Sequence, residues 1–176
     1  SAGNIESINR SLISTSNKRS PGLVAQSIGG GGGFILSGES AVLGSKNEKE
    51  NRLTLNEGAG NTKLINKGAI QTQGEHSMGV IVQSIANGGG IGSSNSGNVD
   101  LRSKSQSESG EITIENSGAI ETSGTGSHGI VAQSISGSGG FVFGNSHKHQ
   151  PIELERQITA ESKDITLKNK GTILTR

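Results

Sequence analysis

Histidine and serine residues supply the first candidates for chemistry in this chain. His147, Lys148 and His149 would place two imidazoles on one face of a strand, where they could bind a metal ion. The chain has no cysteine, and no pair of nearby carboxylates completes such a site, so we interpret these residues as part of an exposed polar loop. Ser134 and His128 could begin a nucleophilic triad, but the matching serines of two other repeats have proline or methionine in place of the histidine. We therefore predict no metal site, no cofactor and no enzyme activity.

Two glycine-rich stretches have the spacing of ligand-binding loops. Residues 124–129 match G-x-G-x-x-G, the dinucleotide fingerprint, which requires a following helix and an acidic residue about 20 positions on. A β-like segment follows instead, and position 149 is histidine, so we interpret this stretch as a turn. The five glycines at 29–33 lack the Gly-Lys-Ser or Gly-Lys-Thr of a phosphate loop. Because glycine-rich residues recur at 87–90 and 137–140, we interpret them as a corner of each repeat that joins two strands.

The composition argues against several classes of function. The chain has 176 residues and a net charge of +1, so no overall basic field would attract nucleic acid or an anionic membrane. Aromatic residues make up 2% of the chain, which is too few for a base-stacking surface. Only 28% of the residues are hydrophobic, which is little for a compact globular core. A solenoid resolves this difficulty, because each coil buries only a narrow apolar strip against its neighbours.

Two motifs recur together along the chain. The first is VAQSI at 24–28 and 131–135, with IVQSI at 81–85. The second, N-x-[GS]-x-I-x-T, occurs at 9–15, 66–72, 116–122 and 169–175. Within each repeat the asparagine precedes the serine of the first motif by 18 residues, whereas successive asparagines are 57, 50 and 53 residues apart. Each repeat therefore has a rigid half and a half of variable length, which indicates a repeat architecture.

The residue pattern of the repeats predicts β-strands. Apolar residues alternate with polar ones, and Gly, Asn and Ser interrupt the alternation, as in strands joined by turns. We count about six short strands per repeat. With three strands to a coil, each repeat would make two coils, and the chain would form six or seven coils in a rod of roughly 30 Å. Equivalent residues should stack in interior columns, for example Phe34, Ile91 and Phe141, and also Ile13, Ile70, Ile120 and Ile173.

The recurring amide residues should stabilise this stack. We predict that the asparagine of each repeat occupies a tight turn in the left-handed conformation. The side chains of Asn9, Asn66, Asn116 and Asn169 could form an amide ladder, as could those of Gln26, Gln83 and Gln133. If a repeat spans two coils, such ladders need a similar residue at the level between, which the sequence alone does not settle.

The segments SHGIVAQSISGSGGF and NSGAIETSG resemble the passenger repeats of large Gram-negative autotransporters, the type V secreted proteins. The resemblance covers essentially the whole chain. It implies a right-handed parallel β-helix that is exported through an outer-membrane β-barrel and displayed at the cell surface. The abundance of Asn and Lys is also similar to the CAMP-like-factor autotransporter group of haemotropic bacteria.

We therefore expect an all-β fold, a right-handed parallel β-helix or solenoid built from about three repeats of 50–57 residues. Residues 1–176 would form a single fragment of a larger passenger, with repeats at about 1–57, 58–109 and 110–163 and a fourth beginning at 164–176. We expect the fragment to be monomeric and to be tethered to the outer membrane through a C-terminal barrel that lies outside it.

The expected function is that of an adhesin, a surface-displayed scaffold that contacts a host cell-surface receptor or matrix component, and antibodies, but not nucleic acid. Two alternatives are a co-haemolytic or toxin-like passenger that acts on host membranes and a carbohydrate-active β-helix enzyme. Recognition should lie in the polar segments that vary between repeats, at about 45–51, 93–109 and 144–150. The residues that we expect to bind the partner are Lys46, Asn47, Glu48, Lys49, Arg102, Lys104, Gln106, His147, Lys148 and His149.

Overall fold

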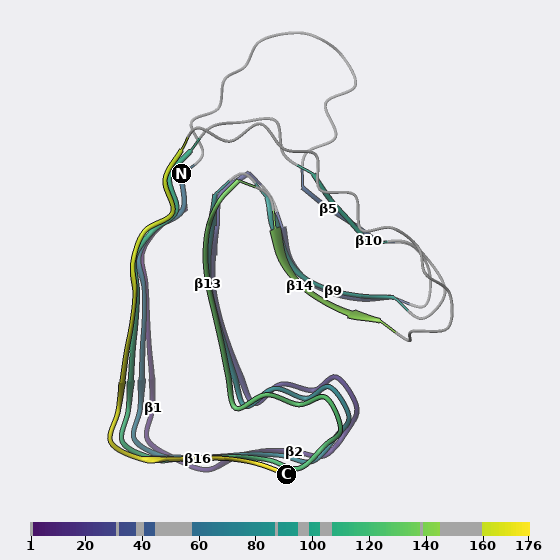
Figure 1. The fold of residues 1–176 in the computed structure, drawn as a ribbon, viewed down its shortest axis with the longest axis vertical. Helices are drawn as coiled ribbons and strands as arrows, with labels where there is room; N and C mark the ends of the chain where they lie inside the picture. Colours follow the sequence, from purple (N-terminus) through teal and green to yellow (C-terminus); the bar gives the residue numbers. More distant parts are fainter. Residues whose placement is uncertain are drawn as a thin grey trace, which may run out of the picture.

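The described part of the chain is all β. A computed structural model describes residues 2–30, 32–37, 41–44, 58–86, 88–94, 99–102, 107–137, 139–144 and 160–176. These residues contain sixteen β-strands and no helix. Seen end-on, equivalent segments of the repeats overlie one another along most of the outline (Figure 1).

Each repeat contributes its strands in the same order. The first repeat contains β1 (Ile5–Asn9), β2 (Ile13–Thr15), β3 (Leu23–Ile28), β4 (Gly32–Ser37) and β5 (Ala41–Gly44). The second contains β6 (Thr62–Asn66), β7 (Ala69–Thr72), β8 (Val80–Ala86), β9 (Gly89–Ser94) and β10 (Val99–Arg102). The third contains β11 (Ile112–Asn116), β12 (Ala119–Thr122), β13 (Ile130–Ser136) and β14 (Gly139–Gly144), and then come β15 (Ile165–Asn169) and β16 (Thr172–Thr175).

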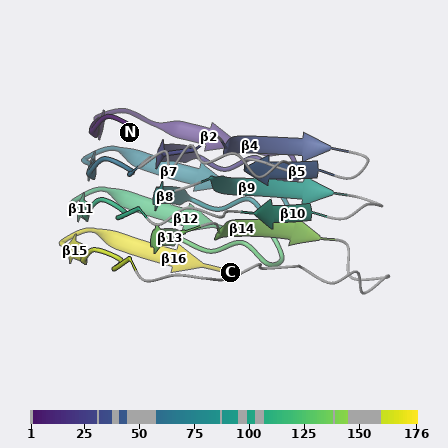
Figure 2. The same cartoon turned by 90° about the horizontal axis from the view of Figure 1, so that it is seen from above.

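Equivalent strands of successive repeats pair in parallel. They form five sheets with the orders β1-β6-β11-β15, β2-β7-β12-β16, β3-β8-β13, β4-β9-β14 and β5-β10. The register aligns the repeats residue by residue, so that Asn66 pairs with Asn9 on one side and with Asn116 on the other. Figure 2 shows the resulting levels stacked on one another. This parallel arrangement is compatible with a β-solenoid and confirms the all-β prediction.

Each repeat makes one level of the stack, so the prediction of two coils per repeat is wrong. β1 pairs directly with β6, which lies one whole repeat later in the chain. The first two repeats each contain five described strands, where we counted about six. The fourth strand does not begin a new coil, because it folds back beside the third and packs against it (Figure 1). Four levels at about 4.8 Å give a height of roughly 14 Å.

Strand β8 separates two apolar clusters. Val80 and Val82 face one cluster, which includes Leu64 from β6. Ile81 faces the other cluster and packs with Ile91 from β9. All seven residues of β8 are buried, as is typical of parallel strands that are covered on both faces. Burial of each valine or isoleucine side chain of β8 contributes about 1.5–3 kcal/mol. The predicted columns are confirmed in register, since Ile13, Ile70, Ile120 and Ile173 pair with one another, as do Phe34, Ile91 and Phe141. Their interior placement holds at the inner levels, where Ile70, Ile91 and Ile120 are buried, whereas Phe34 and Ile173 at the end levels are exposed.

The asparagine ladder is confirmed, but the left-handed conformation predicted for its members is wrong. The described non-glycine residues with positive φ are Arg19 and His76. Each asparagine instead ends a strand, and its side chain bridges the corner that follows, as when Nδ2 of Asn66 donates to the carbonyl oxygen of Gly68 at 3.2 Å. Between levels, each Nδ2 donates to the next Oδ1 at 2.9, 2.7 and 2.7 Å along Asn9, Asn66, Asn116 and Asn169.

The glutamine ladder is also confirmed. Nε2 of Gln26 donates to Oε1 of Gln83 at 2.6 Å, and Gln83 donates to Gln133 at the same distance. Each buried amide group in such a ladder has a partner at the next level, so that it is not left unsatisfied inside the protein. The ladders therefore fix the register of the stack as well as stabilising it.

Candidate interaction surface

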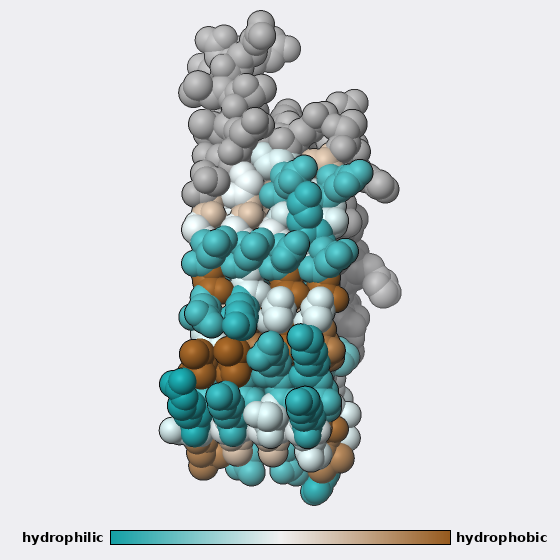
Figure 3. Space-filling model, turned by 90° about the vertical axis from the view of Figure 1, so that its left-hand side faces the viewer, coloured by the Kyte–Doolittle hydropathy of each residue, from teal (hydrophilic) through white to brown (hydrophobic). Residues whose placement is uncertain are grey.

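The outer side of the sheet β1-β6-β11-β15 carries the side chains that alternate with the buried ones. In β6, Leu64 and Asn66 are buried, whereas Lys63 and Ile65 are partly exposed and point outward. Figure 3 shows this side of the molecule, which is largely hydrophilic in its described part. We define the outer face as the outward residues of the four strands together with the residue that follows each strand: Glu6, Ile8, Arg10, Lys63, Ile65, Lys67, Thr113, Glu115, Ser117, Thr166, Lys168 and Lys170.

Positive charge dominates the outer face. It has five basic and two acidic side chains, a net charge of +3, whereas the whole chain has a net charge of +1. Only one of the cations is neutralised there, because Nζ of Lys63 lies 3.4 Å from Oε1 of Glu6. The other four form no ion pair with a carboxylate in the described part of the chain; they are Arg10, Lys67, Lys168 and Lys170.

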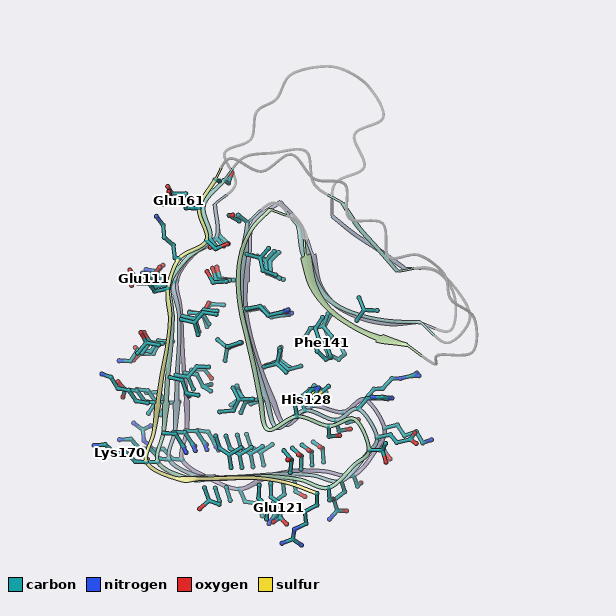
Figure 4. The ribbon with its side chains drawn as sticks, viewed as in Figure 1. Glu111, Glu121, His128, Phe141, Glu161 and Lys170 are labelled. Atoms are coloured by element: carbon teal, nitrogen blue, oxygen red, sulfur yellow. The ribbon has the colours of Figure 1, made fainter. Side chains whose placement is uncertain are left out.

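Three of these cations occupy one column that runs from level to level. The backbone N–H of Lys67 donates to the carbonyl oxygen of Asn9 at 2.8 Å, and that of Lys170 donates to Asn116 at 2.7 Å. These bonds place each cation directly after the asparagine ladder. Figure 4 shows Lys170 at the lower left corner, where the sheet that contains β15 meets the sheet that contains β16. We call Arg10, Lys67, Ser117 and Lys170 the basic column; all four are exposed.

The other end of the same side is acidic. Figure 4 shows Glu111 and Glu161 there, far from Lys170 along the strand direction. Nζ of Lys163 lies 2.9 Å from Oε2 of Glu108, and this carboxylate raises the pKa of the lysine above its usual 10.5. Glu108, Glu111 and Lys163 line a surface hollow of about 830 Å³. The side of the stack is therefore charged with opposite signs at its two ends.

The corner between the second and third strands carries an ion pair that joins the first two repeats. Nζ of Lys18 lies 2.6 Å from Oε2 of Glu75, and the lysine lowers the pKa of this carboxylate below its usual 4.5. In the third repeat this corner is the G-x-G-x-x-G stretch at 124–129. Gly126 has a φ of 68°, close to the 55° and 52° of the equivalent Arg19 and His76. Strand β13 follows, so the prediction of a turn is confirmed.

The glycine run at 29–33 joins β3 to β4, as predicted for a corner of each repeat; Gly31 lies outside the described residues. In the second repeat, Gly89 is buried and has a φ of 132°. A Cβ there would overlap the carbonyl oxygen of Gly139 at the next level. Nε2 of Gln83 reaches the carbonyl oxygen of Gly90 at 3.5 Å. The glycines thus shape a tight corner to which the glutamine ladder is bound.

The serine that recurs in VAQSI links two sides of the stack. Oγ of Ser84 donates to the carbonyl oxygen of Gly60 in its own repeat at 3.0 Å. It also accepts a hydrogen bond from the backbone N–H of Gly110 in the next repeat at 2.7 Å. Ser27 and Ser134 make the equivalent donor contacts at 3.0 and 3.1 Å. A structural role therefore explains why serine occurs in every repeat.

Most of the predicted binding residues lie outside the described part of the chain. Arg102 is the last residue of β10, but its side chain is not among those described. The other nine lie in segments outside the described residues: Lys46, Asn47, Glu48, Lys49, Lys104, Gln106, His147, Lys148 and His149. Among the described residues, the structure brings together a different set, the charged residues of the outer face.

Sequence reasoning missed the basic column, although a signal for it exists. The residue after each recurring asparagine is Arg10, Lys67, Ser117 or Lys170. This position is outward because the asparagine before it is buried, and the asparagine burial follows from the ladder. The sequence analysis predicted binding in the variable segments instead, because these segments differ most between repeats.

Comparison with protein-family models, with curated proteins and with solved structures gave no match to this chain. Among the residues that the structure describes, no group of three or more His, Asp or Glu side chains could hold a metal ion. The same residues include no helix that is long and apolar enough to span a membrane.

Proposed function

We propose that this chain is a segment of a right-handed parallel β-helix that serves as the surface-displayed scaffold of an autotransporter adhesin. The proposal starts from the resemblance of its repeats to autotransporter passengers. The parallel pairing of equivalent strands in five sheets supports a helical path of the chain. A right-handed path is favoured because connections between parallel strands of one sheet are right-handed in about 98% of cases.

The observation that carries the proposal is that strand register stays constant while the connecting segments change in length. β5 and β6 are joined by residues 45–61, whereas the equivalent β10 and β11 are joined by the shorter 103–111. The asparagine and glutamine ladders nevertheless align in every repeat. A scaffold that tolerates such changes can present different recognition segments without a change of fold.

The proposed partners are a host cell-surface receptor or matrix component, and antibodies. The variable segments at 45–51, 93–109 and 144–150 would make the contacts, and the protein would act at the bacterial surface. The stacked levels would hold these segments at fixed spacings. Multivalent contact through several weak sites would then give more affinity than any one segment.

Binding of the purified chain to host cells and to immobilised matrix proteins tests this proposal. We expect saturable binding, and we expect antibodies raised against residues 45–51 to block it. A matched control replaces 45–51 by a Gly/Ser segment of the same length and leaves the ladders intact. If the chain binds no cell and no matrix protein, the adhesin proposal is wrong; if the replaced chain binds as well as the parent, residues 45–51 are not the contact.

A further inference from the structure

We propose that the basic column binds a linear sulfated polysaccharide that lies along the stack. Arg10, Lys67 and Lys170 recur on the outer face at three of its four levels, with Ser117 at the remaining one. The choice of a polysaccharide met outside the cell rests on the proposed surface display. The binding itself depends only on the geometry and charge of the column.

The cations of the column are free to bind an anion. All three are exposed, and none forms an ion pair with a carboxylate among the described residues. Lys63, by contrast, is already paired with Glu6. An unpaired ammonium or guanidinium needs no existing partner to be displaced before it contacts a sulfate, so its charge is available for binding.

The spacing of the column suits a linear polyanion. Successive levels lie about 4.8 Å apart, so Arg10 and Lys67 are neighbours, and Lys170 follows about 10 Å beyond Lys67. Lys168 adds a fourth cation on the outer face, two residues before Lys170. The residue after each cation is small: Ser11, Gly68 or Gly171.

Two features favour a polysaccharide over a nucleic acid. The outer face contains no aromatic residue on which a base could stack, and the whole chain has no Trp and no Tyr. Hydroxyl groups lie on this face instead: Ser117 belongs to the basic column, and Thr113 and Thr166 share a row with Lys63. Glu115 is the carboxylate nearest the column on this face, and it pairs in register with Lys168 without an ion pair. Sulfates and sugar hydroxyls match this set of donors and acceptors.

Heparin provides the probe, with binding measured by calorimetry between about 50 and 200 mM NaCl. We expect the affinity to fall with salt, and we expect the double variant R10Q/K67Q to bind about tenfold more weakly, with a shallower salt dependence. The matched control K18Q/R19Q removes the same charge from the corner between β2 and β3 and should bind as the parent does. Equal weakening by both double variants would show a response to net charge alone and would overturn the proposal.

A gain of binding provides the second arm. Ser117→Lys fills the one uncharged level of the column and should bind heparin about threefold more tightly, whereas Thr125→Lys adds the same charge elsewhere and should not. Absence of heparin binding at low salt, or tighter binding of single-stranded oligothymidine than of heparin, would overturn the polysaccharide assignment. Melting temperatures of all variants confirm that each is folded. Because heparin binding is measured without cells, it can succeed while the adhesion test fails, so failures of the two proposals are distinguishable.

Discussion

The inner and outer sides of the sheet β1-β6-β11-β15 follow different rules, although the same strands supply both. The inner column that contains Asn66 holds asparagine at all four levels, and each amide bonds to the next. The outer column that contains Ile65 holds two isoleucines, a glutamate and a lysine. An asparagine of this inner column must match its equivalents because they are its hydrogen-bond partners, whereas an outer side chain meets water.

This difference decides which recurrences need a functional explanation. Identity along the asparagine column follows from stacking, because a change at one inner level removes hydrogen bonds to the levels on both sides. The outer column of Lys67 lies under no such constraint. Its cations would repel one another across neighbouring levels, so folding does not favour them. Their recurrence is therefore better explained by a ligand than by stability.

The largest expected effect is at the glycine corner. Gly89→Val would force a side chain into a backbone with positive φ and into the carbonyl oxygen of Gly139. We expect the free energy of unfolding to fall by about 3–5 kcal/mol, since strain and overpacking add. Chemical denaturation followed by circular dichroism measures the change.

Two other glycines separate the causes of that loss. Gly33 has a φ of 139°, but a Cβ there would meet nothing within 4 Å, so Gly33→Ala should cost only the conformational strain, about 1–2 kcal/mol. A Cβ at Gly3 meets nothing and the position has no positive φ, so Gly3→Ala should stay within about 0.5 kcal/mol of the parent. Equal stability of Gly89→Val and the parent would show that this corner acts as a flexible linker.

The second effect compares two adjacent residues on opposite sides of the sheet. Asn66 is fully buried, and Asn66→Ala removes the ladder partner of Nδ2 of Asn9 and of Oδ1 of Asn116. We expect a loss of about 2–3 kcal/mol. Lys67→Gln changes an exposed side chain with no ion pair in the described part of the chain, and we expect less than about 0.5 kcal/mol. Denaturation midpoints of the two variants measure the contrast.

The end of the ladder supplies the control. Asn169 is exposed and bonds along the ladder only to Asn116, so Asn169→Ala should cost about half as much as Asn66→Ala. A similar loss at Asn66 and Lys67 would mean that burial and the ladder do not determine stability here, and the comparison between the two sides would fail.

Much of the fold could be predicted because residues that recur in the sequence are the residues that stack on one another in the structure. Alternation of apolar and polar residues predicted the strands, and the recurrence of the Asn and VAQSI motifs predicted the columns and both ladders. Alternation of apolar and polar residues identifies a strand but not the strand with which it pairs. The predicted number of two coils per repeat was therefore wrong. The ladders contained the missing information: a buried Asn66 needs an asparagine at the very next level, and its repeat has no second copy of the motif.

The candidate site could not be predicted in the same way. Asparagine favours left-handed turns, but here Asn66 extends the strand and uses its side chain at the corner, and Arg19 and His76 take the left-handed positions instead. The left-handed turn predicted at Asn66 therefore hid the outward direction of Lys67, although the predicted ladder implies it. The binding residues proposed from the variable segments remain predictions, and the adhesion experiment tests them.

The smallest expected effect concerns the inner column that contains Thr72 and Thr122. Thr72 and Thr122 are equivalent and fully buried. Oγ1 of Thr72 donates to the carbonyl oxygen of Ser77 at 2.6 Å, whereas Oγ1 of Thr122 has no hydrogen-bond partner among the described residues. Valine has nearly the same shape and is also β-branched. Thr72→Val should therefore cost about 1 kcal/mol, and Thr122→Val should stabilise the protein by about 1 kcal/mol because it removes a buried, unpaired hydroxyl.

Chemical denaturation measures the change in unfolding free energy for each variant. If Thr72→Val loses stability and Thr122→Val gains it, the shape of the side chain is sufficient at position 122 and its hydroxyl is not needed. A loss of stability in Thr122→Val equal to that in Thr72→Val would show that the Thr122 hydroxyl is bonded in solution, and hydrogen bonding would then account for the whole column. Either result refines the rule for the inner side. The two variants leave the outer face unchanged, including its ion pair between Lys63 and Glu6.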